Sequence, residues 1–512
     1  MQLTMSLHRA LRAHPERVAT VSGARTRTVA EVADRVARLA GGLKTLGVQE
    51  GDRVAVLSAN SDRYHEAYFA SWWAGAPVNA VNTRWSAAEI AFCLSDSDSA
   101  ILLVDDDHLP LVPELRARCP ELHSVIHCGE GSAPADLIGY EELIASSPAV
   151  SDARRGGRDL AALLYTGGTT GTPKGVMLSH QSMMTSQLGA QVAHGAALRG
   201  GTTLVSAPLF HIAALGSWNT QNLVGGTQVF LPSFDADAVL AAIERHRINT
   251  LLLVPTMLQL LVERAESASY DLGSVHGVGY GGSPISATLL ERVMKTFPNS
   301  GFYQGYGMTE TAMVCVLGPE DHRAGGDRLR SAGQVVPHAE AAVVGPDGAE
   351  LPPGRVGEVV VRGANVMLGY WRRSAESAEA LRDGWLHTGD AGRMDENGYV
   401  YIVDRIKDMI VTGGENVYSV EVENAVARHP AVAGCAVVGL PDDRWGERVH
   451  AVVVLRPSAE ATADEIRAHT KNLIAGYKAP RSVEFTEALP VSAAGKVLKS
   501  ELRDRAVGRH RL

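Results

Sequence analysis

The chain has 512 residues, about three times the length of a typical domain of ~150 residues, so we expect two or three domains. Apolar residues make up 45% and charged residues 21%, a globular balance that excludes a disordered or collagen-like chain. Lysine and arginine number 48 against 57 acidic residues, giving a net charge of −9. A nucleic-acid binder usually carries a basic excess, so this balance argues against one.

The composition also favours a cytoplasmic protein. The five cysteines are odd in number and form no C-x-x-C pair, which suits a reducing compartment and gives no zinc framework. No apolar stretch of the signal-peptide type follows the N-terminus. The strongest apolar run, residues 250–262, is shorter than the ~20 residues that span a bilayer. We therefore expect no transmembrane segment. Small-molecule substrates are the expected partners, together with a second copy of the chain in a homodimer.

The first predicted elements alternate between helices and strands. Residues 30–48 carry apolar positions at helical spacing, and residues 52–57 form a buried strand. The same reading predicts a strand at 100–104, a helix at 236–246 and a strand at 250–254. Strands separated by helices indicate parallel α/β layers.

The character of the sequence changes from residue 345 onward. A turn at 346–348 precedes short strands at 357–363 and 398–403, which predict a small β-rich part. After residue 404 a helix, two strands and a helix follow, at 417–428, 431–439, 449–455 and 463–474. We therefore predict an α/β protein of two domains, with residues 1–404 as layered α/β subdomains plus the β-rich part, and residues 405–512 as a small α+β domain.

A loop rich in glycine and threonine leads into Lys174. Residues 163–175 read Leu-Leu-Tyr-Thr-Gly-Gly-Thr-Thr-Gly-Thr-Pro-Lys-Gly. Glycines let backbone N–H groups approach phosphate oxygens, threonine hydroxyls add donors, and the lysine adds positive charge. A Walker A loop is excluded because Pro173 precedes the lysine and Gly175 follows it. The pattern favours a phosphate-binding loop over a flexible surface loop.

Residues 304–310, Gln-Gly-Tyr-Gly-Met-Thr-Glu, combine the groups that a nucleotide site needs. Tyr306 can stack on a purine, Thr309 can donate to a phosphate, and Glu310 is a hard carboxylate suited to Mg²⁺. Asp390, at the end of residues 385–390, can accept hydrogen bonds from both ribose hydroxyls. The structural alternatives are a glycine-rich turn with an exposed glutamate and a surface Gly-Asp turn.

Residues 166–175 resemble the signature loop of the adenylate-forming enzymes, which include acyl-CoA synthetases, aryl-CoA ligases, firefly-type luciferases and peptide-synthetase adenylation domains. The family usually has serine where this chain has Gly167, which removes one hydroxyl donor but keeps a backbone N–H. Further family-like motifs follow in family order, at residues 208–211, 280–284, 304–310, 385–390, 404–410, 413–416 and 489–499. Residues 1–160 fit the family less distinctively.

The resemblance implies a role for each matching position. ATP and AMP would be bound by Thr166, Gly167, Gly168, Thr169, Thr170, Lys174, Gly282, Ser283, Gln304, Gly305, Tyr306, Thr309, Asp390 and Arg405. Catalysis would involve Thr309, Glu310 as the Mg²⁺ ligand, His211 at the junction of acyl pocket and pantetheine tunnel, and Lys496. Lys407 would be the hinge of a mobile C-terminal domain. Coenzyme A would contact Gly413, Gly414, Trp445, Tyr477 and Arg481.

The implied mechanism has two half-reactions. A carboxylate attacks the α-phosphate of ATP and pyrophosphate leaves; then a thiol attacks the acyl-adenylate and AMP leaves. Between the steps the small domain rotates about Lys407, withdraws Lys496 and brings in the face at Gly413 and Gly414. No carrier domain of ~80 residues follows Lys499, so we expect free coenzyme A as the acceptor, and a carrier protein is the less favoured alternative.

The acyl pocket is expected to be apolar and roomy. Positions that line it in related aryl-CoA ligases correspond to His211, Ala213, Ser217, Gly282, Gly305 and Val314. Residues 212–218 carry no carboxylate to pair with an α-ammonium, which disfavours an amino acid, and no arginine that a dicarboxylate would want. We expect a medium- or long-chain fatty acid, with a coumarate-, ferulate- or benzoate-type aryl acid as the nearest competitor.

Two other classes remain as alternatives on the same scaffold. One is a luciferase-like oxygenase, which the composition disfavours. The other is a non-enzymatic acyl or nucleotide sensor, which would be expected to lack Lys496 or Glu310, and both are present.

Overall fold

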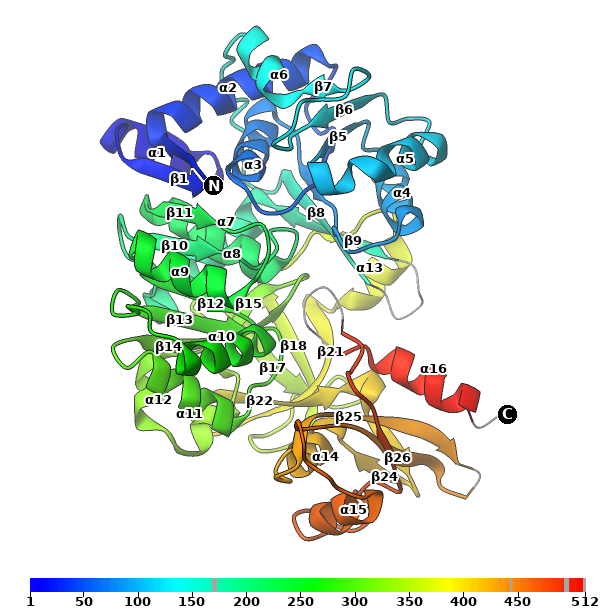
Figure 1. Cartoon of the computed structure of the whole chain (residues 1–512). Coiled ribbons are helices and arrows are strands. Elements are labelled where there is room, and N and C mark those ends of the chain that lie inside the picture. The colour runs from blue at the N-terminus through cyan, green and yellow to red at the C-terminus, as the bar shows by residue number, and fades with distance from the viewer. Residues whose placement is uncertain (168–172, 443, 492–496, 510–512) are drawn as a thin grey trace. The chain divides into compact units, whose positions relative to one another are not determined.

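The computed structural model describes residues 1–167, 173–442, 444–491 and 497–509 (Figure 1). It divides into two compact units, Met1–Glu340 with Val361–Leu386 and Ala341–Val360 with His387–Leu512. The predicted α/β class is confirmed. The boundary at residue 404 stays a prediction, because compactness groups the β-rich strands with the C-terminal segment. None of the described helices is both long and apolar enough to cross a membrane.

The first unit contains a sheet built mainly from the N-terminal third of the chain, with one short strand from residues 369–370. Adjacent strands of this sheet are parallel from β7 to β8. At the other edge, β9 pairs antiparallel with β8, and β19 pairs antiparallel with β9. In the order β7, β6, β5, β3, β4, β8, β9 and β19, the strands span Ile138–Gly139, Ser124–His127, Ile101–Val104, Val54–Leu57, Val78–Ala80, Leu160–Thr166, Lys174–Ser179 and Gly369–Tyr370. The accompanying helices α2 to α6 span Val29–Thr45, Asp62–Ala74, Ala87–Asp96, Val112–Arg118 and Tyr140–Ser146.

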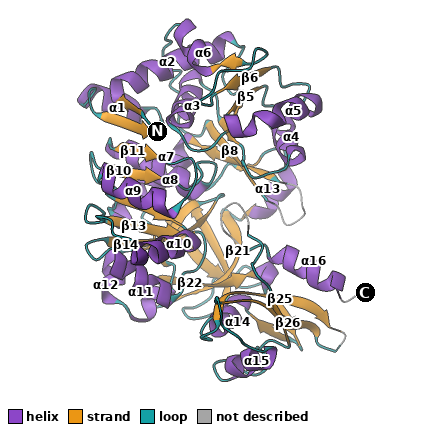
Figure 2. Cartoon of the chain, in the orientation of Figure 1, coloured by secondary structure: helices purple, strands orange, loops and turns teal. Residues whose placement is uncertain are grey.

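A second sheet of the same unit is parallel from β1 to β14 and antiparallel at both ends. In the order β2, β1, β11, β10, β12, β13, β14, β15 and β16, its strands span Arg25–Thr28, Val18–Ser22, Thr227–Phe230, Thr202–Val205, Thr250–Leu253, Gly277–Gly281, Gly301–Met308, Ala312–Leu317 and Gly333–Val335. Helices α7 to α12 span His180–His194, Ile212–Val224, Ala236–His246, Pro255–Ser267, Ala287–Thr296 and Pro319–Ala324. Figure 2 shows α10, α11 and α12 beside β13 and β14, where an extensive apolar core forms.

Helices α3 and α8 join the two sheets of this unit through aromatic side chains. The Trp218 ring of α8 lies 5.9 Å from that of Trp72 and 5.2 Å from that of Tyr68, and all three rings are buried. The Trp218 indole donates to Nδ1 of His65 at 3.1 Å. Desolvation lowers the pKa of His65 to about 3, so the imidazole stays neutral and can accept this bond.

The second unit holds the β-rich strands and the small α+β part. Strands β17, β18, β21 and β22, at Ala339–Val344, Gly357–Gly363, Trp385–Met394 and Tyr399–Arg405, lie side by side in that order. A smaller sheet orders β24, β23, β26 and β25, at Glu415–Val417, Ile410–Thr412, Gly446–Leu455 and Val432–Asp442, and β27 (Ser482–Phe485) joins β26. Helices α14, α15 and α16 span Ser419–Val426, Ala463–Lys471 and Lys499–Arg509. The remaining short elements are α1, α13 and β20, at Met5–Ala13, Ser374–Ala380 and Leu381–Arg382.

The predicted helices and strands are confirmed to within a few residues at their ends. The helix predicted at 236–246 is α9, Ala236–His246, and the one predicted at 30–48 is α2, which ends three residues earlier. Helix α2 starts where it does because Thr28 and Glu31 form a capping box, each accepting from the other's backbone N–H.

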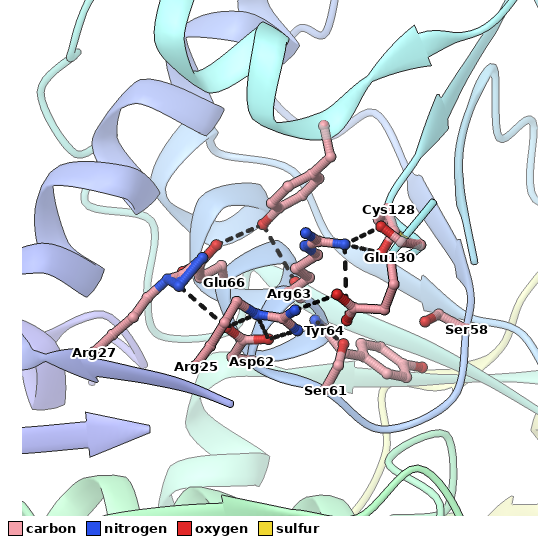
Figure 3. A network of polar contacts seen from close by, with 12 residues as sticks. Arg25, Arg27, Ser58, Ser61, Asp62, Arg63, Tyr64, Glu66, Cys128 and Glu130 are labelled. Atoms are coloured by element: carbon pink, nitrogen blue, oxygen red, sulfur yellow. Dashed lines mark hydrogen bonds and ion pairs between the residues drawn. The ribbon is translucent and has the colours of Figure 1, made fainter. Parts of the chain in front are cut away.

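A network of arginines and carboxylates fixes the N-terminal half of α3 (Figure 3). Glu66 is fully buried and accepts from Arg27 and Arg35 at 3.0 and 2.8 Å and from the Tyr140 hydroxyl at 2.8 Å. Burial alone would raise the pKa of Asp62, but the hydrogen bonds and positive charge of Arg25 outweigh it and lower that pKa. The network brings together β2, α2, α3 and α6.

We predict that Glu66→Ala destabilises the fold by about 3 kcal/mol, because it leaves two largely buried guanidinium groups without their shared carboxylate. The measurement is the shift in the midpoint of urea unfolding. Glu114→Ala is the control. Glu114 pairs with Arg118 at the surface, so this substitution should cost about 0.5 kcal/mol or less. Equal shifts for the two variants would contradict a structural role for the network.

Candidate active site

The predicted phosphate loop connects β8 to β9. Thr166 ends β8 and lies opposite Lys174, the first residue of β9, in an antiparallel register. Gly167 is described and exposed. The other predicted residues of the loop, Gly168, Thr169 and Thr170, lie outside the described residues. The connection between the two strands thus falls within the sequence motif, residues 166–175.

Glu310, Tyr370 and Lys174 come together from distant parts of the first unit. Glu310 is only 7% exposed, and its Oε1 accepts from the Tyr370 hydroxyl at 2.8 Å. Lys174 Nζ lies 5.2 Å from the centre of the Tyr370 ring, a distance at which a cation is attracted to the ring face. Tyr370 lies in β19, which pairs with β9 and so reaches this position. The sequence motifs did not indicate Tyr370, which follows Glu310 by 60 residues.

The nucleotide motifs at 280–284 and 304–310 lie on neighbouring strands. Strands β13 and β14 are parallel, and Gly281 lies opposite Gly305. A Cβ on Gly281 would lie 2.4 Å from the Gly305 carbonyl oxygen, so the close approach requires glycine. Gly282 and Ser283 follow directly at the carboxyl end of β13, where open α/β sheets bind ligands. Four other predicted residues, Gln304, Gly305, Tyr306 and Thr309, are half-buried along β14 and just after it.

His211 lies at the end of a loop that is held from the other sheet. The His211 N–H donates to the Pro208 carbonyl at 3.0 Å, and His211 caps α8. Asn60, which follows β3, donates to the Ala207 carbonyl at 2.8 Å and accepts from the Leu209 N–H at 2.9 Å. Asn60 is 3% exposed and was not predicted. Its position after a buried strand was the available signal, but its partners lie about 150 residues away.

The predicted acyl-pocket residues differ in their exposure. Ala213 is exposed and Ser217 is half-buried, and both lie on α8. Val314 is 1% exposed, so its side chain belongs to the core of the described structure. A cavity of only about 10 Å³, room for about one water, lies beside α8, and Ala214, Ser217 and Trp218 line it.

The predicted ribose pair is brought together within the second unit. Asp390 and Arg405 lie opposite each other on β21 and β22, with Arg405 Nε 2.7 Å from Asp390 Oδ1. The Asp390 backbone N–H donates to the Thr388 hydroxyl at 3.0 Å. Asp390 is 3% exposed, so the carboxylate is held in a defined orientation.

Lys407 lies in a short 3-10 helix, Ile406–Asp408, directly after β22. Burial lowers the pKa of Lys407, against the opposing charge of the neighbouring Asp408. Asp408 pairs with Arg503 of α16 at 2.8 Å. Lys496, the predicted catalytic lysine, lies outside the described residues.

Three of the predicted coenzyme A contacts form one cluster in the second unit. The Arg481 guanidinium lies 4.4 Å from the centre of the Trp445 ring, and the Gly413 N–H donates to the Trp445 carbonyl at 2.8 Å. Gly413 has φ +62°, and a Cβ there would lie 2.9 Å from the ring. Gly414 is exposed and Tyr477 is 42% exposed. The cluster offers two cationic groups and an aromatic face, since Arg444 also lies over Trp445.

Comparisons with known proteins place this geometry in a family. The family model described as AMP-binding enzyme matches residues 7–371, and the one described as AMP-binding enzyme C-terminal domain matches residues 421–496. A feruloyl-CoA synthase from Amycolatopsis sp. is 40% identical over 97% of both chains. A fatty acid–[acyl-carrier-protein] ligase, ScoC, from Streptomyces coeruleorubidus is 38% identical over 96% of this chain and 94% of that one.

The solved structures agree with the sequence comparisons. The crystal structure of the anthranilate CoA ligase AuaEII with anthranoyl-AMP has a TM-score of 0.92 and 28% identity, covering 100% of this chain and 98% of that one. The first family model alone matches well over half of the chain, and the feruloyl-CoA synthase matches 97% of it. The chain therefore belongs to the AMP-binding enzyme family, within the adenylate-forming superfamily of acyl- and aryl-CoA ligases, and it is an acid–thiol ligase.

Proposed function

We propose that the chain is an AMP-forming acid:CoA ligase that activates a hydrophobic carboxylic acid through an acyl-adenylate. The observation that carries the proposal is the joint position of Glu310, Tyr370 and Lys174 beside the β8–β9 loop. A buried carboxylate and a lysine at a glycine-rich loop suit a polyphosphate better than an apolar ligand. The family implies ATP and coenzyme A as co-substrates.

The residues around Glu310 fit a magnesium ion. Mg²⁺ keeps most of its waters and takes one or two protein carboxylates, and Glu310 supplies one, oriented by Tyr370. When bound, the ion would neutralise charge that develops as pyrophosphate leaves. Lys174 and the backbone N–H groups of the loop would bind phosphate oxygens, and Thr309 would donate to the phosphate that becomes AMP. Asp390 and Arg405 would hold the ribose.

Lys496 is proposed to stabilise the adenylation transition state, and the cluster of Gly413, Trp445 and Arg481 to receive coenzyme A. The arginines over Trp445 can pair with phosphates, and the ring can stack on an adenine. Because the two sets of residues serve different steps, we propose that the domain after Lys407 presents them in turn. AMP is the leaving group in the second step, so the chain needs no protein nucleophile.

For the acid, an aryl acid of the hydroxycinnamate type is the better supported choice, although the sequence alone favoured a fatty acid. The feruloyl-CoA synthase is 40% identical, and a ligase for an aromatic acid is similar over the whole chain. A fatty acid remains the second candidate, because ScoC is 38% identical. That relative also makes a carrier-protein thiol the alternative acceptor.

The proposal is tested by pyrophosphate release across a panel of aryl and fatty acids, with and without coenzyme A. We expect release that depends on the acid and thioester that depends on coenzyme A. If no acid releases pyrophosphate, the enzymatic proposal fails. If release occurs while thioester forms only with a carrier protein, the acceptor is wrong.

Lys496→Ala should lower acid-dependent pyrophosphate release about 10²–10³-fold, the usual cost of losing one preorganised group at a transition state. Thioester formation from supplied acyl-AMP should stay close to wild type. Lys295→Ala, on α11, is the control with the same chemical change. Equal loss of both half-reactions would contradict separate roles for the two steps.

Tyr370→Phe should lower kcat/KM for ATP about tenfold and raise the magnesium concentration needed for half-maximal rate. The variant removes a hydrogen bond to a buried carboxylate, worth about 1.5–3 kcal/mol. Tyr270→Phe removes a similar bond to Asp237 at the surface and is the control. An unchanged magnesium dependence in Tyr370→Phe would contradict the proposal that Tyr370 orients Glu310 as a magnesium ligand.

A further inference from the structure

One face of α8 stays accessible along half the helix. Ile212, Ala213, Gly216 and Ser217 are exposed or half-buried, whereas Ala214, Leu215 and Trp218 are buried. At 3.6 residues per turn, the accessible positions form one stripe that begins just after His211. The next residue on that stripe is Thr220, and it is only 5% exposed.

Gln187 of α7 covers the stripe at Thr220. The Thr220 hydroxyl lies 3.0 Å from Gln187 Oε1 and 2.9 Å from the Gly216 carbonyl. A Cβ on Gly216 would lie 3.3 Å from the same amide, so glycine at this position leaves room for it. Gln187 is 5% exposed. The amide therefore lies against the accessible face of α8 at Gly216 and Thr220, one to two helical turns beyond Ala213.

Helix α7 is itself fixed to the strand that borders the nucleotide motifs. The Ser186 hydroxyl accepts from the Met313 N–H of β15 at 3.2 Å, and Ser186 is fully buried. The Met313 thioether in turn packs on Gly305, where a Cβ would lie 2.8 Å from its sulfur. Helix α7 thus contacts both α8 and β15, which hold Ala213, Ser217 and Val314.

The second end of the Gln187 amide has no partner among the residues that the structure describes. Its Nε2 donates to no described residue, and it is not among the described side-chain atoms that are both sealed from water and unpartnered. This end therefore borders open space, although the residue as a whole is nearly buried. A buried polar group in such a position loses hydrogen bonding unless a ligand or a water supplies it.

We propose that Gln187 is a specificity-determining residue that binds a hydrogen-bonding group at the far end of the acyl chain. The proposal rests on the proposed function, and it selects one substrate class: acids that carry a hydroxyl or similar polar group at the end opposite the carboxyl. A hydroxyl both donates and accepts, so it pairs with the amide whichever way the oxygen and nitrogen are oriented.

The chemistry of the site agrees with such an acid. One acid of this kind has an aromatic ring joined to the carboxyl by two carbons and a hydroxyl at the para position. The small residues of the stripe accommodate the flat ring, and the amide lies where the ring ends. A saturated chain would place a methyl group against the amide and leave it without a partner.

The test compares pyrophosphate release with 4-hydroxycinnamate, cinnamate and 4-methylcinnamate in the wild type and in Gln187→Leu. We expect the wild type to favour the hydroxylated acid over the methylated one about tenfold in kcat/KM. In Gln187→Leu this ratio should fall to about one or reverse, while kcat/KM for ATP stays within about twofold. Thr220→Val, which frees the amide from α8, should give an intermediate ratio.

Gln191→Leu is the matched control. Gln191 lies one turn further along α7, and both ends of its amide pair with the backbone of Ala197. The Gln191→Leu variant should keep the wild-type ratio of kcat/KM between the hydroxylated and methylated acids. This control separates an effect on selectivity from an effect on folding.

The outcomes distinguish the inference from the function on which it rests. A wild type that releases pyrophosphate equally with the hydroxylated and methylated acids, or that prefers fatty acids, overturns the role of Gln187 and leaves the ligase intact. An unchanged ratio in soluble Gln187→Leu overturns it as well. If the wild type releases pyrophosphate with no acid at all, the proposed function itself fails.

Discussion

The hydrogen bonds of Asn60 to the backbone of residues 207 and 209 are the constraint on which the first unit's site depends. They join the carboxyl end of β3 in one sheet to the carboxyl end of β10 in the other. The loop that they hold leads directly into His211 and α8. Since buried backbone groups are costly to leave unpaired, about 1–3 kcal/mol each, this loop has one favourable position. The direction of α8 follows from that position of the loop, and so does the placement of the α8 residues that are proposed to line the acyl pocket.

The arginine and carboxylate network serves the same constraint from the other side of α3. Asn60 lies directly before Ser61, whose side chain caps α3, and Asp62 and Glu66 are on the first turns of that helix. Buried ion pairs add little net stability, because desolvation offsets their attraction. Their geometric effect is larger, since Arg25, Arg27 and Arg35 place α3 relative to β2 and α2. The aromatic contacts of Trp218 then transfer this placement to α8.

The sequence predicted the elements whose signals are local. Helix α9 and the strands β3, β5 and β12 have regular apolar spacing within one segment, so periodicity alone located them. The two-residue strand β19 carries no such signal, and it forms only because β9 offers an open edge. Tyr370 was therefore beyond prediction, although Glu310, its partner, was identified from its motif.

The same limit applies to the acyl pocket. Resemblance to a family indicated Ala213 and Ser217, because they follow a motif on the same helix. Gln187 lies on a different helix and belongs to no motif, and its contact with Thr220 depends on how α7 and α8 pack. Val314 was expected in the pocket, and its side chain is only 1% exposed in the described structure, so its place there stays a prediction. Pocket residues that come from tertiary packing cannot be identified from local sequence motifs.

A single polar amide in an apolar pocket discriminates asymmetrically between acids. Adding or removing a methylene in an apolar pocket changes binding by only about 1–3 kcal/mol, so walls made of alanine, glycine and serine cannot reject many shapes. A buried amide is different, because any acid that covers it without a hydrogen bond incurs its desolvation. On the proposed role of Gln187, selectivity in this chain would come less from the fit of the small residues than from the polar group that borders the stripe.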